Sequence, residues 1–463
     1  MLPSERRLLV LDDDPTGSQC VHDISVAFEQ NPELLAGTLS TPGSACFTLT
    51  NSRALDEVDA VELNRATVRG VIQRLREESG EDAVRQLHVI SRSDSTLRGH
   101  VIAEPTVIAD TLAEEGFPVD AVLFSPAMLE AGRYTQDDVH FAIVDGQAVP
   151  VSDTDFANDA TFGYSSSDLK EFLQERSNGS IAAEDVLSIS LKDIRDEGAS
   201  HVESLLADAR NRRWVVINAE TYEDMQVVAD AVTALEKQGH RFITRCGPSF
   251  VRPLAGQSDP RILDSADIAT DPERLQHGLV VVGSHVGLTT QQLHVLQERG
   301  GLVEYELDVR QLLDPETRMR HVDETTARLR RSLQTDDVAL YTSRELISAS
   351  DPAESLAIAR SVSEAVVEVV ARVRDARPAW VIAKGGITSH EVAQKGLGIR
   401  LARVVGQFFP GQISLFEPVE AADSALGCPY VVFPGNVGGR EALAEVAERL
   451  KGATTDDGLG VRA

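Results

Sequence analysis

The chain has 463 residues, of which 42% are hydrophobic and 25% charged, and its formal net charge is −29. This length exceeds the size at which one hydrophobic core keeps growing, so two domains are expected. The acidic excess argues against general affinity for nucleic acid or anionic membranes, because proteins bind both through surplus Lys and Arg. An anionic ligand would therefore need local arginines, helix N-termini and a divalent metal.

Targeting and redox signals are sparse. The N-terminal sequence becomes acidic before it could form the apolar region of a signal peptide, and no apolar run reaches transmembrane length. The four cysteines lie far apart, with no Cys-x-x-Cys pair and no His cluster at zinc-ligand spacing. We therefore expect a cytoplasmic protein with buried free thiols and with neither a nucleic-acid nor a membrane partner.

The first predicted strand, residues 7–11, stops at the acidic sequence Asp12-Asp13-Asp14-Pro15-Thr16-Gly17. Consecutive carboxylates at the tip of a buried strand repel one another, so they are tolerated best where a cation or a hydroxyl-rich ligand lies between them. The alternative is a solvent-exposed turn started by Asp14-Pro15.

Strands and helices then alternate. Apolar runs predict strands at 45–50, 87–90 and 121–124, and apolar residues at helical spacing predict helices at 56–78 and 101–115. This alternation is typical of an α/β fold whose mostly parallel sheet is covered by helices.

The loop after residues 87–90 is crowded with polar side chains. It contains Arg92, Asp94, Ser95, Thr96 and Arg98. Ligands of open α/β sheets bind at the carboxyl ends of strands, and arginines flanking an aspartate suit a small molecule with a carboxylate and hydroxyls. Arg133, on a glycine-containing loop after the strand at 121–124, could join the same site. The alternative is a salt-bridged surface turn.

Residues 253–276 are richer in Pro, Gly, Asp and Ser and lose periodicity, which predicts a linker. The expected domains are therefore residues 1–252 and 277–463.

In the second domain three apolar strands each run into a glycine turn, within 278–287, 380–390 and 430–439. Such turns let the backbone approach a polyphosphate, whose oxygens the hydroxyls of Ser284, Thr388 and Ser389 could bind. The alternative is that the glycines serve close packing alone. The turns form neither a Walker A loop nor a G-x-G-x-x-G fingerprint.

Taken together, these segments resemble the four-carbon acid sugar kinase family, long described as a domain of unknown function. Asp13-Asp14-Pro15-Thr16-Gly17 is similar to the family's Asp-Asp-x-Thr-Gly, and Ser93 to Gly99 is similar to its Asp-Ser-Thr-Leu-Arg-Gly. Gly132-Arg133 follows the expected Pro-Ala loop, and the three glycine turns fall where the family's nucleotide-binding segments lie.

The resemblance implies two α/β domains, one binding a tetronate-type sugar acid and the other ATP, with the reaction in a cleft between them. It implies phosphoryl transfer from ATP, with Mg²⁺, to a hydroxyl of the acid. Asp94, Asp13 or Asp14 would accept the hydroxyl proton, and the sequence does not choose among them. The expected substrate-binding residues are Arg92, Ser95, Thr96, Arg98 and Arg133. The expected nucleotide-binding residues are Ser284, Gly385, Gly386, Ile387, Thr388, Ser389, Gly435 and Asn436.

Several alternatives stay open. The acceptor is threonate, erythronate, a 3-oxo-tetronate or another short or branched sugar acid. A non-catalytic, effector-like binding protein would show no ATP turnover with any acid sugar, and a nicotinamide-dependent dehydrogenase is disfavoured by the missing G-x-G-x-x-G. The metal ligands and the oligomeric state, with a homodimer as one possibility, are also open.

Overall fold

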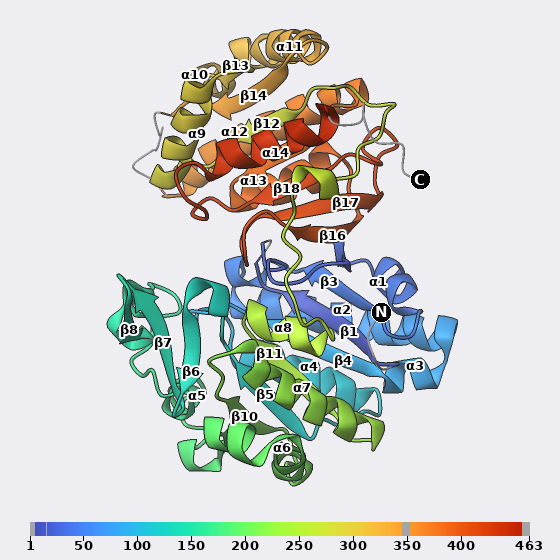
Figure 1. The fold of residues 1–463 in the computed structure, drawn as a ribbon, viewed down its shortest axis with the longest axis vertical. Coiled ribbons are helices and arrows are strands. Elements are labelled where there is room, and N and C mark those ends of the chain that lie inside the picture. The colour runs from blue at the N-terminus through green and yellow to red at the C-terminus, as the bar shows by residue number, and fades with distance from the viewer. Residues whose placement is uncertain (1–4, 15, 345–351, 456–463) are drawn as a thin grey trace. The chain divides into compact units, whose positions relative to one another are not determined.

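The computed structural model describes residues 5–14, 16–344 and 352–455. The chain divides into two compact units, Met1–Pro260 and Arg261–Ala463 (Figure 1). Pro15 of the predicted Asp-Asp-Pro-Thr-Gly motif lies outside the described residues. Within the predicted linker, the N–H of Leu263 donates to the carbonyl of Gln407 at 2.9 Å, so this part of the segment packs with the second unit.

The first unit is built on a parallel sheet with the strand order β2-β3-β1-β4-β11-β5-β10-β9. Every pairing between these strands is parallel. Their bounds are β1 Arg7–Asp12, β2 Ile24–Ala27, β3 Ala45–Leu49, β4 Leu87–Arg92, β5 Ala121–Ser125, β9 Leu187–Ile189, β10 Arg213–Ile217 and β11 Phe242–Cys246. The order reverses at β1, which has β3 on one side and β4 on the other, and such a switch point is where ligands of open α/β sheets bind.

Two groups of helices cover this sheet: α1, α2 and α4 pack together, as do α6, α7 and α8 (Figure 1). The predicted helix at 56–78 is α2, whose N–H groups are capped by Asp56 and which ends at Gly80 with φ +84°. The helices are α1 Pro32–Leu39, α2 Glu57–Ser79, α3 Glu81–Arg85, α4 Ala103–Glu114, α5 Leu169–Arg176, α6 Ala199–Ala207, α7 Tyr222–Lys237 and α8 Pro248–Leu254.

A small antiparallel sheet, which the sequence did not predict, follows β5. It consists of β6 Arg133–Gln136, β7 Val139–Val144 and β8 Gln147–Pro150. Ile143 and Val144 are exposed, so these strands lack the continuous buried apolar run that marks the strands of the parallel sheet. Its position matters because it carries Arg133 at the start of β6.

The second unit has the strand order β13-β14-β12-β15-β18-β17-β16, parallel from β13 to β18 and antiparallel from β18 to β16. The strands are β12 Leu279–Val282, β13 Leu302–Leu307, β14 Asp337–Thr342, β15 Val381–Lys384, β16 Leu401–Gln407, β17 Ser414–Glu420 and β18 Tyr430–Phe433. The helices are α9 Gly287–Arg299, α10 Val309–Leu313, α11 Pro315–Ser332, α12 Pro352–Val373, α13 Gly386–Glu391 and α14 Ala442–Thr455.

Helices α9 and α14 pack against one face of this sheet over a core that includes Trp380 and Phe433. The prediction of two α/β domains with mostly parallel, helix-covered sheets is confirmed. All four cysteines are buried and unpaired, as predicted. No helix in the described ranges is both long and apolar enough to cross a membrane.

Candidate functional site

The carboxyl ends of β1, β3 and β4 meet at one edge of the first unit's sheet. Asp12, the last residue of β1, lies in register with Leu49 at the end of β3 and with Arg92 at the end of β4. Because the strands are parallel, the loops that follow them emerge side by side. This register brings the predicted acidic loop and the predicted Asp94–Arg98 loop together.

Arg53, on the loop after β3, joins the three predicted catalytic carboxylates. Its Nη2 lies 2.7 Å from Asp13 Oδ1 and 3.4 Å from Asp14 Oδ2, and its Nη1 lies 3.8 Å from Asp94 Oδ1. Sequence reasoning did not select Arg53, although it follows the predicted strand at 45–50. A guanidinium surrounded by three carboxylates neutralises their mutual repulsion and fixes their positions.

A buried ion pair supports this cluster from the sheet side. Arg92 pairs with Asp12, and both side chains are almost fully buried. A Cβ on Gly17 would lie 1.7 Å from Arg92 Nη2 and 2.0 Å from Asp12 Oδ2, so any larger residue there would displace this ion pair. Arg92 therefore holds the acidic loop in place, and its guanidinium is already committed to a carboxylate.

The Asp94–Arg98 loop is held by its own side chains. Arg98 Nε donates to Asp94 Oδ2 at 2.8 Å, and the Thr96 hydroxyl donates to the same carboxylate. Leu97 is buried with φ +67°, a left-handed conformation that a branched residue adopts only where its surroundings impose it. The loop thus presents Asp94 and Arg98 in a fixed arrangement.

Arg133 approaches the same loop from β6. Its Nη1 donates to Ser95 Oγ at 3.1 Å, and the guanidiniums of Arg98 and Arg133 lie over the Phe156 ring at 5.6 and 5.3 Å from its centroid. Burial, with the nearby charge of Arg98, lowers the pKa of Arg133. Within the described ranges, no carboxylate lies at ion-pair distance from Arg133, and its buried Nε has no hydrogen-bond partner. Two neighbouring guanidiniums, one without an acid, suit a bound carboxylate.

Residues 153–164, whose sequence has no clear periodicity, also contribute to this site. They supply Phe156, and Tyr164, whose hydroxyl donates to the Thr96 carbonyl at 2.9 Å. Neither aromatic residue carries a sequence signal that distinguishes it from core packing.

The carboxylates of Asp14 and Asp94 are stabilised in their charged form. Burial alone would raise the pKa of both carboxyl groups. The charge of Arg53 outweighs burial and holds each pKa below its usual range. Arg92 adds to this effect at Asp14, and Arg98 adds to it at Asp94. The two groups therefore remain ionised throughout the neutral pH range.

This arrangement predicts acid sensitivity of the first unit. A carboxyl whose folded pKa is lowered contributes stability above its unfolded pKa of about 3.9, and that stability is lost as pH falls toward the folded value. We expect the melting temperature of the wild type to fall more steeply between about pH 4.5 and 2.5 than that of Asp94→Asn, as measured by circular dichroism. Parallel slopes for the two proteins would contradict the assignment.

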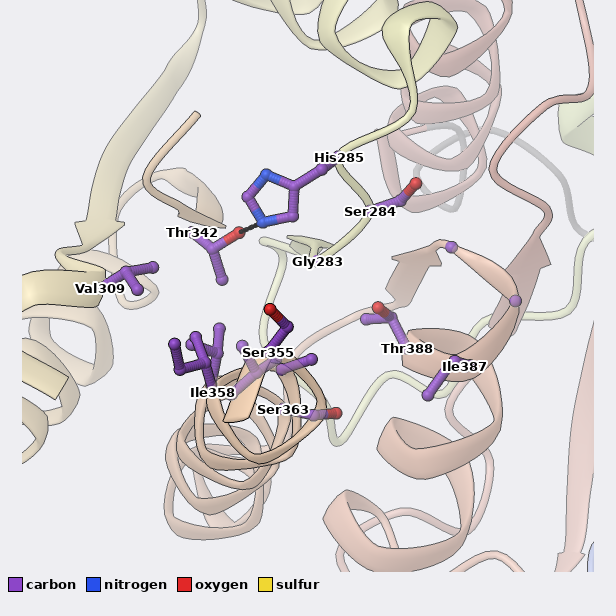
Figure 2. Close-up of a pocket in the computed structure, with 15 residues that line it drawn as sticks. Gly283, Ser284, His285, Val309, Thr342, Ser355, Ile358, Ser363, Ile387 and Thr388 are labelled. Carbon is purple, nitrogen blue, oxygen red and sulfur yellow. Dashed lines mark hydrogen bonds between the residues drawn. The ribbon is translucent and has the colours of Figure 1, made fainter. Parts of the chain in front are cut away.

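The second unit contains a pocket of about 530 Å³ at the carboxyl ends of β12, β14 and β15 (Figure 2). Five of the predicted nucleotide-binding residues line it, and three do not. Those that line it are Ser284, Gly385, Gly386, Ile387 and Thr388. The Ser389 hydroxyl instead donates to the Ala383 carbonyl at 2.6 Å, and Asn436 is exposed on the turn after β18.

The three glycine turns come close together. A Cβ on Gly283 would lie 2.4 Å from Thr388 Oγ1, and one on Gly435 would lie 3.0 Å from Ser284 Oγ. Thr289 Oγ1 donates to the Gly435 carbonyl at 2.8 Å, which ties the first turn to the third. Close backbone approach at these turns leaves room for an extended anion beside main-chain N–H groups.

The wall of the pocket that α12 forms is mostly apolar. It carries Ile358, Val362 and Val366 together with Ser355 and Ser363, and Val309 lies at one end of the pocket (Figure 2). His285 Nε2 lies 3.4 Å from the Thr342 hydroxyl. Burial, with the charge of Arg344, lowers the pKa of His285, so this ring is neutral near pH 7. A mostly apolar slot with a few polar groups suits a flat heterocyclic ring, with glycine turns at its end for phosphates.

Comparisons with known proteins match the two units to two different domain families. Residues 8–254 match a family model described as a sugar-binding N-terminal domain, and residues 279–443 match one described as a nucleotide-binding C-terminal domain. A search of curated proteins finds no match.

Solved structures share the fold. A Salmonella typhimurium LT2 protein, described provisionally as a tRNA synthase, superimposes with a TM-score of 0.68 at 14% identity, over 95% of this chain and 98% of that chain. A Haemophilus influenzae protein of the DUF1537 family superimposes with a TM-score of 0.64 at 17% identity, over 96% of this chain and 99% of that chain.

Proposed function

Because the chain belongs to the four-carbon acid sugar kinase family, whose members join a sugar-binding N-terminal domain to a nucleotide-binding C-terminal domain, we propose that it is an ATP-dependent kinase acting on a hydroxyl of a short sugar acid. The observation that carries this proposal is the Arg98–Arg133 pair over Phe156, beside carboxylates gathered around Arg53. That combination suits a ligand with a carboxylate at one end and hydroxyls along its length.

The roles of the side chains follow from their partners. Arg133 and Arg98 bind the substrate carboxylate and so orient the carbon chain. Asp13 is 1% exposed and engaged by Arg53, so it serves to position that arginine. Asp14, with 31% of its side chain exposed, accepts the proton of the reacting hydroxyl.

The nucleotide binds in the second unit, with its base in the apolar slot beside α12 and its phosphates at the glycine turns. The described ranges hold no group of three His, Cys, Asp or Glu side chains suited to a metal ion. This fits Mg²⁺ carried by the phosphates, since that ion keeps several waters and needs few protein ligands. The hydroxyls of Ser284 and Thr388 would contact it, and it would neutralise charge on the phosphate oxygens.

The direct test is a screen for acid-dependent ADP release. Threonate, erythronate, their 3-oxo forms and branched analogues are each incubated with the protein, ATP and Mg²⁺, and ADP is measured against an acid-free control. We expect at least one acid to raise the rate and to yield a phosphorylated acid by mass spectrometry. A protein that binds ATP but releases no ADP above the control with any acid is not a kinase of this class.

Arg133→Ala is expected to lower kcat/KM for the acid about ten- to a hundredfold, because a charge-assisted hydrogen bond contributes roughly 1.5–3 kcal/mol. Arg98→Ala acts in the same direction. Nucleotide affinity should stay at the wild-type level. The melting temperature should change little in Arg133→Ala, since the cost of burying a guanidinium without a carboxylate at ion-pair distance offsets its hydrogen bond to Ser95 and its contact with the Phe156 ring.

The matched control for Arg133 is Arg212→Ala, since Arg212 lies on the same unit, is 37% exposed and pairs with Asp110. Its kinetics should match the wild type. If Arg133→Ala instead lowers acid and nucleotide affinity equally, or only destabilises the protein, Arg133 does not bind the substrate.

A further inference from the structure

Lys384, the last residue of β15, is a fully buried lysine beside the nucleotide pocket. Its side chain is 0% exposed, and the next residues, Gly385–Thr388, line the pocket. Among the described residues no carboxylate lies within ion-pair distance of its ammonium, and burial is the sole cause that lowers the pKa of Lys384, to about 7. A buried cation without an acid is costly, so its presence here calls for a partner.

The ammonium is held by the turn after β18. Lys384 Nζ donates to the Pro434 carbonyl at 2.6 Å and to the Gly435 carbonyl at 3.2 Å, and it lies 4.0 Å from the centroid of the Phe433 ring. Thr289 Oγ1 donates to the same Gly435 carbonyl. Lys384 thus connects the glycine turn that follows it to the glycine turn at 434–436.

These contacts also orient main-chain donors. In a planar trans peptide the N–H points opposite to the C=O, so the N–H groups of Gly435 and Asn436 point away from the Lys384 ammonium. Neither N–H donates a hydrogen bond to another described residue. Two adjacent free N–H groups with a cation behind them form an arrangement that attracts an anion.

The elements packed around Lys384 carry few titratable groups. His285 lies on the turn after β12, His390 lies on α13, and Tyr430 on β18 donates its hydroxyl to the Ser389 carbonyl. The pKa of each histidine is lowered by burial, and that of Tyr430 is raised by burial, so all three are uncharged near pH 8. Glu391, at the end of α13, pairs with Lys395 at 2.7 Å. Among the described residues burial alone acts on the pKa of Lys384, so no neighbouring charge holds its proton in the free protein.

We propose that Lys384 is a positioning residue that takes up one proton when a nucleoside polyphosphate binds at the turns 283–284, 385–388 and 434–436. The proton passes from solvent to the Nζ lone pair, and the ammonium formed faces the phosphates through the Pro434–Asn436 peptides. This inference rests on the proposed nucleotide site. Because the free protein holds this proton weakly above pH 7 and the complex holds it firmly, affinity for the nucleotide falls as pH rises from 7 to 9.

Calorimetry measures the proton directly. ADP with Mg²⁺ is titrated into the full-length protein at pH 8, in buffers of different ionisation enthalpy. At this pH a phosphate with a second pKa of about 6 carries no proton, so the nucleotide itself releases none. We expect uptake of nearly one proton per ADP bound by the wild type. Lys384→Arg, which keeps a permanent charge, should bind ADP without uptake, and Lys384→Met should bind about ten- to a hundredfold more weakly, also without uptake.

Lys395→Met is the matched control, since Lys395 is 57% exposed and pairs with Glu391 at 2.7 Å in the same unit. It should take up the wild-type number of protons. Two results would overturn the inference and leave the proposed function intact. One is binding of ADP by the wild type without proton uptake, and the other is undiminished proton uptake by Lys384→Met. Absence of ADP and ATP binding to the folded wild type overturns both.

Discussion

Asp14→Asn is expected to lower kcat about a thousandfold while KM for the sugar acid and affinity for the nucleotide change little. A positioned general base contributes roughly a hundred- to ten-thousandfold. The amide oxygen can still accept from the Thr16 N–H, as Asp14 Oδ1 does at 2.8 Å, so the loop keeps its conformation. The variant loses the proton acceptor and the negative charge that faces Arg53, while the hydrogen bond within the loop is kept. Steady-state kinetics with the acid found in the screen measure this effect.

The choice of Asp14 over Asp94 follows from the arrangement of charges. Asp94 accepts a hydrogen bond from Arg98, and its charge acts on Arg133, so it lies beside the two arginines that we propose to bind the substrate carboxylate. Arg53 lies between Asp14 and Asp94, so we infer that Asp14 would meet a bound carbon chain farther from its carboxylate. A hydroxyl distant from the carboxylate would therefore meet Asp14.

The pH profile adds an independent measurement. Since a base must be ionised to act and the pKa of Asp14 is lowered, the acidic limb of kcat should lie below the usual aspartate value of about 3.9. The control, Asp110→Asn, alters a carboxylate of the same unit that pairs with Arg212 away from this cluster. If Asp94→Asn abolishes turnover and Asp14→Asn does not, the base is Asp94.

The sequence predicted those parts of the two sites that local signals specify. Buried apolar runs located β1, β4 and β12, and glycines and consecutive aspartates marked the loops at their ends. Parallel pairing of β1 with β4 brings the acidic loop beside the loop containing Asp94, and only the family resemblance had placed both loops in one site. The strands and loops themselves were predictable for a local reason. These features depend on residues adjacent in the chain, whose burial pattern and turn chemistry are visible in sequence.

What the sequence did not predict depends on contacts between distant segments. Arg53 became central only because β3 pairs with β1, and Phe156 reaches the arginines from a segment without periodicity. Arg92 looked equivalent to Arg98, but its pairing with buried Asp12 assigns it a different role. Likewise, no local pattern shows that Lys384 is buried without a carboxylate.

The nucleotide side is tested most strongly by Gly385→Ala, for which we expect at least a hundredfold loss of ADP and ATP affinity. Gly385 has φ +123°, a conformation that strains any residue with a Cβ by roughly 1–3 kcal/mol. The added Cβ would also lie 3.0 Å from both Ser284 Cβ and Thr388 Oγ1 and 3.4 Å from the Ser284 backbone nitrogen. The first two turns must then shift apart, and the N–H groups that we propose to bind the phosphates move with them.

Gly439→Ala provides the control in the same unit, because a Cβ there meets nothing within 4 Å, and its nucleotide affinity should equal that of the wild type. Calorimetry with ADP measures both variants, and circular dichroism confirms that they are folded. Binding of the sugar acid to Gly385→Ala should be unchanged, since every residue assigned to the acid belongs to the first unit. Wild-type nucleotide affinity in Gly385→Ala would mean that the glycine turns serve packing alone and that the phosphates bind elsewhere.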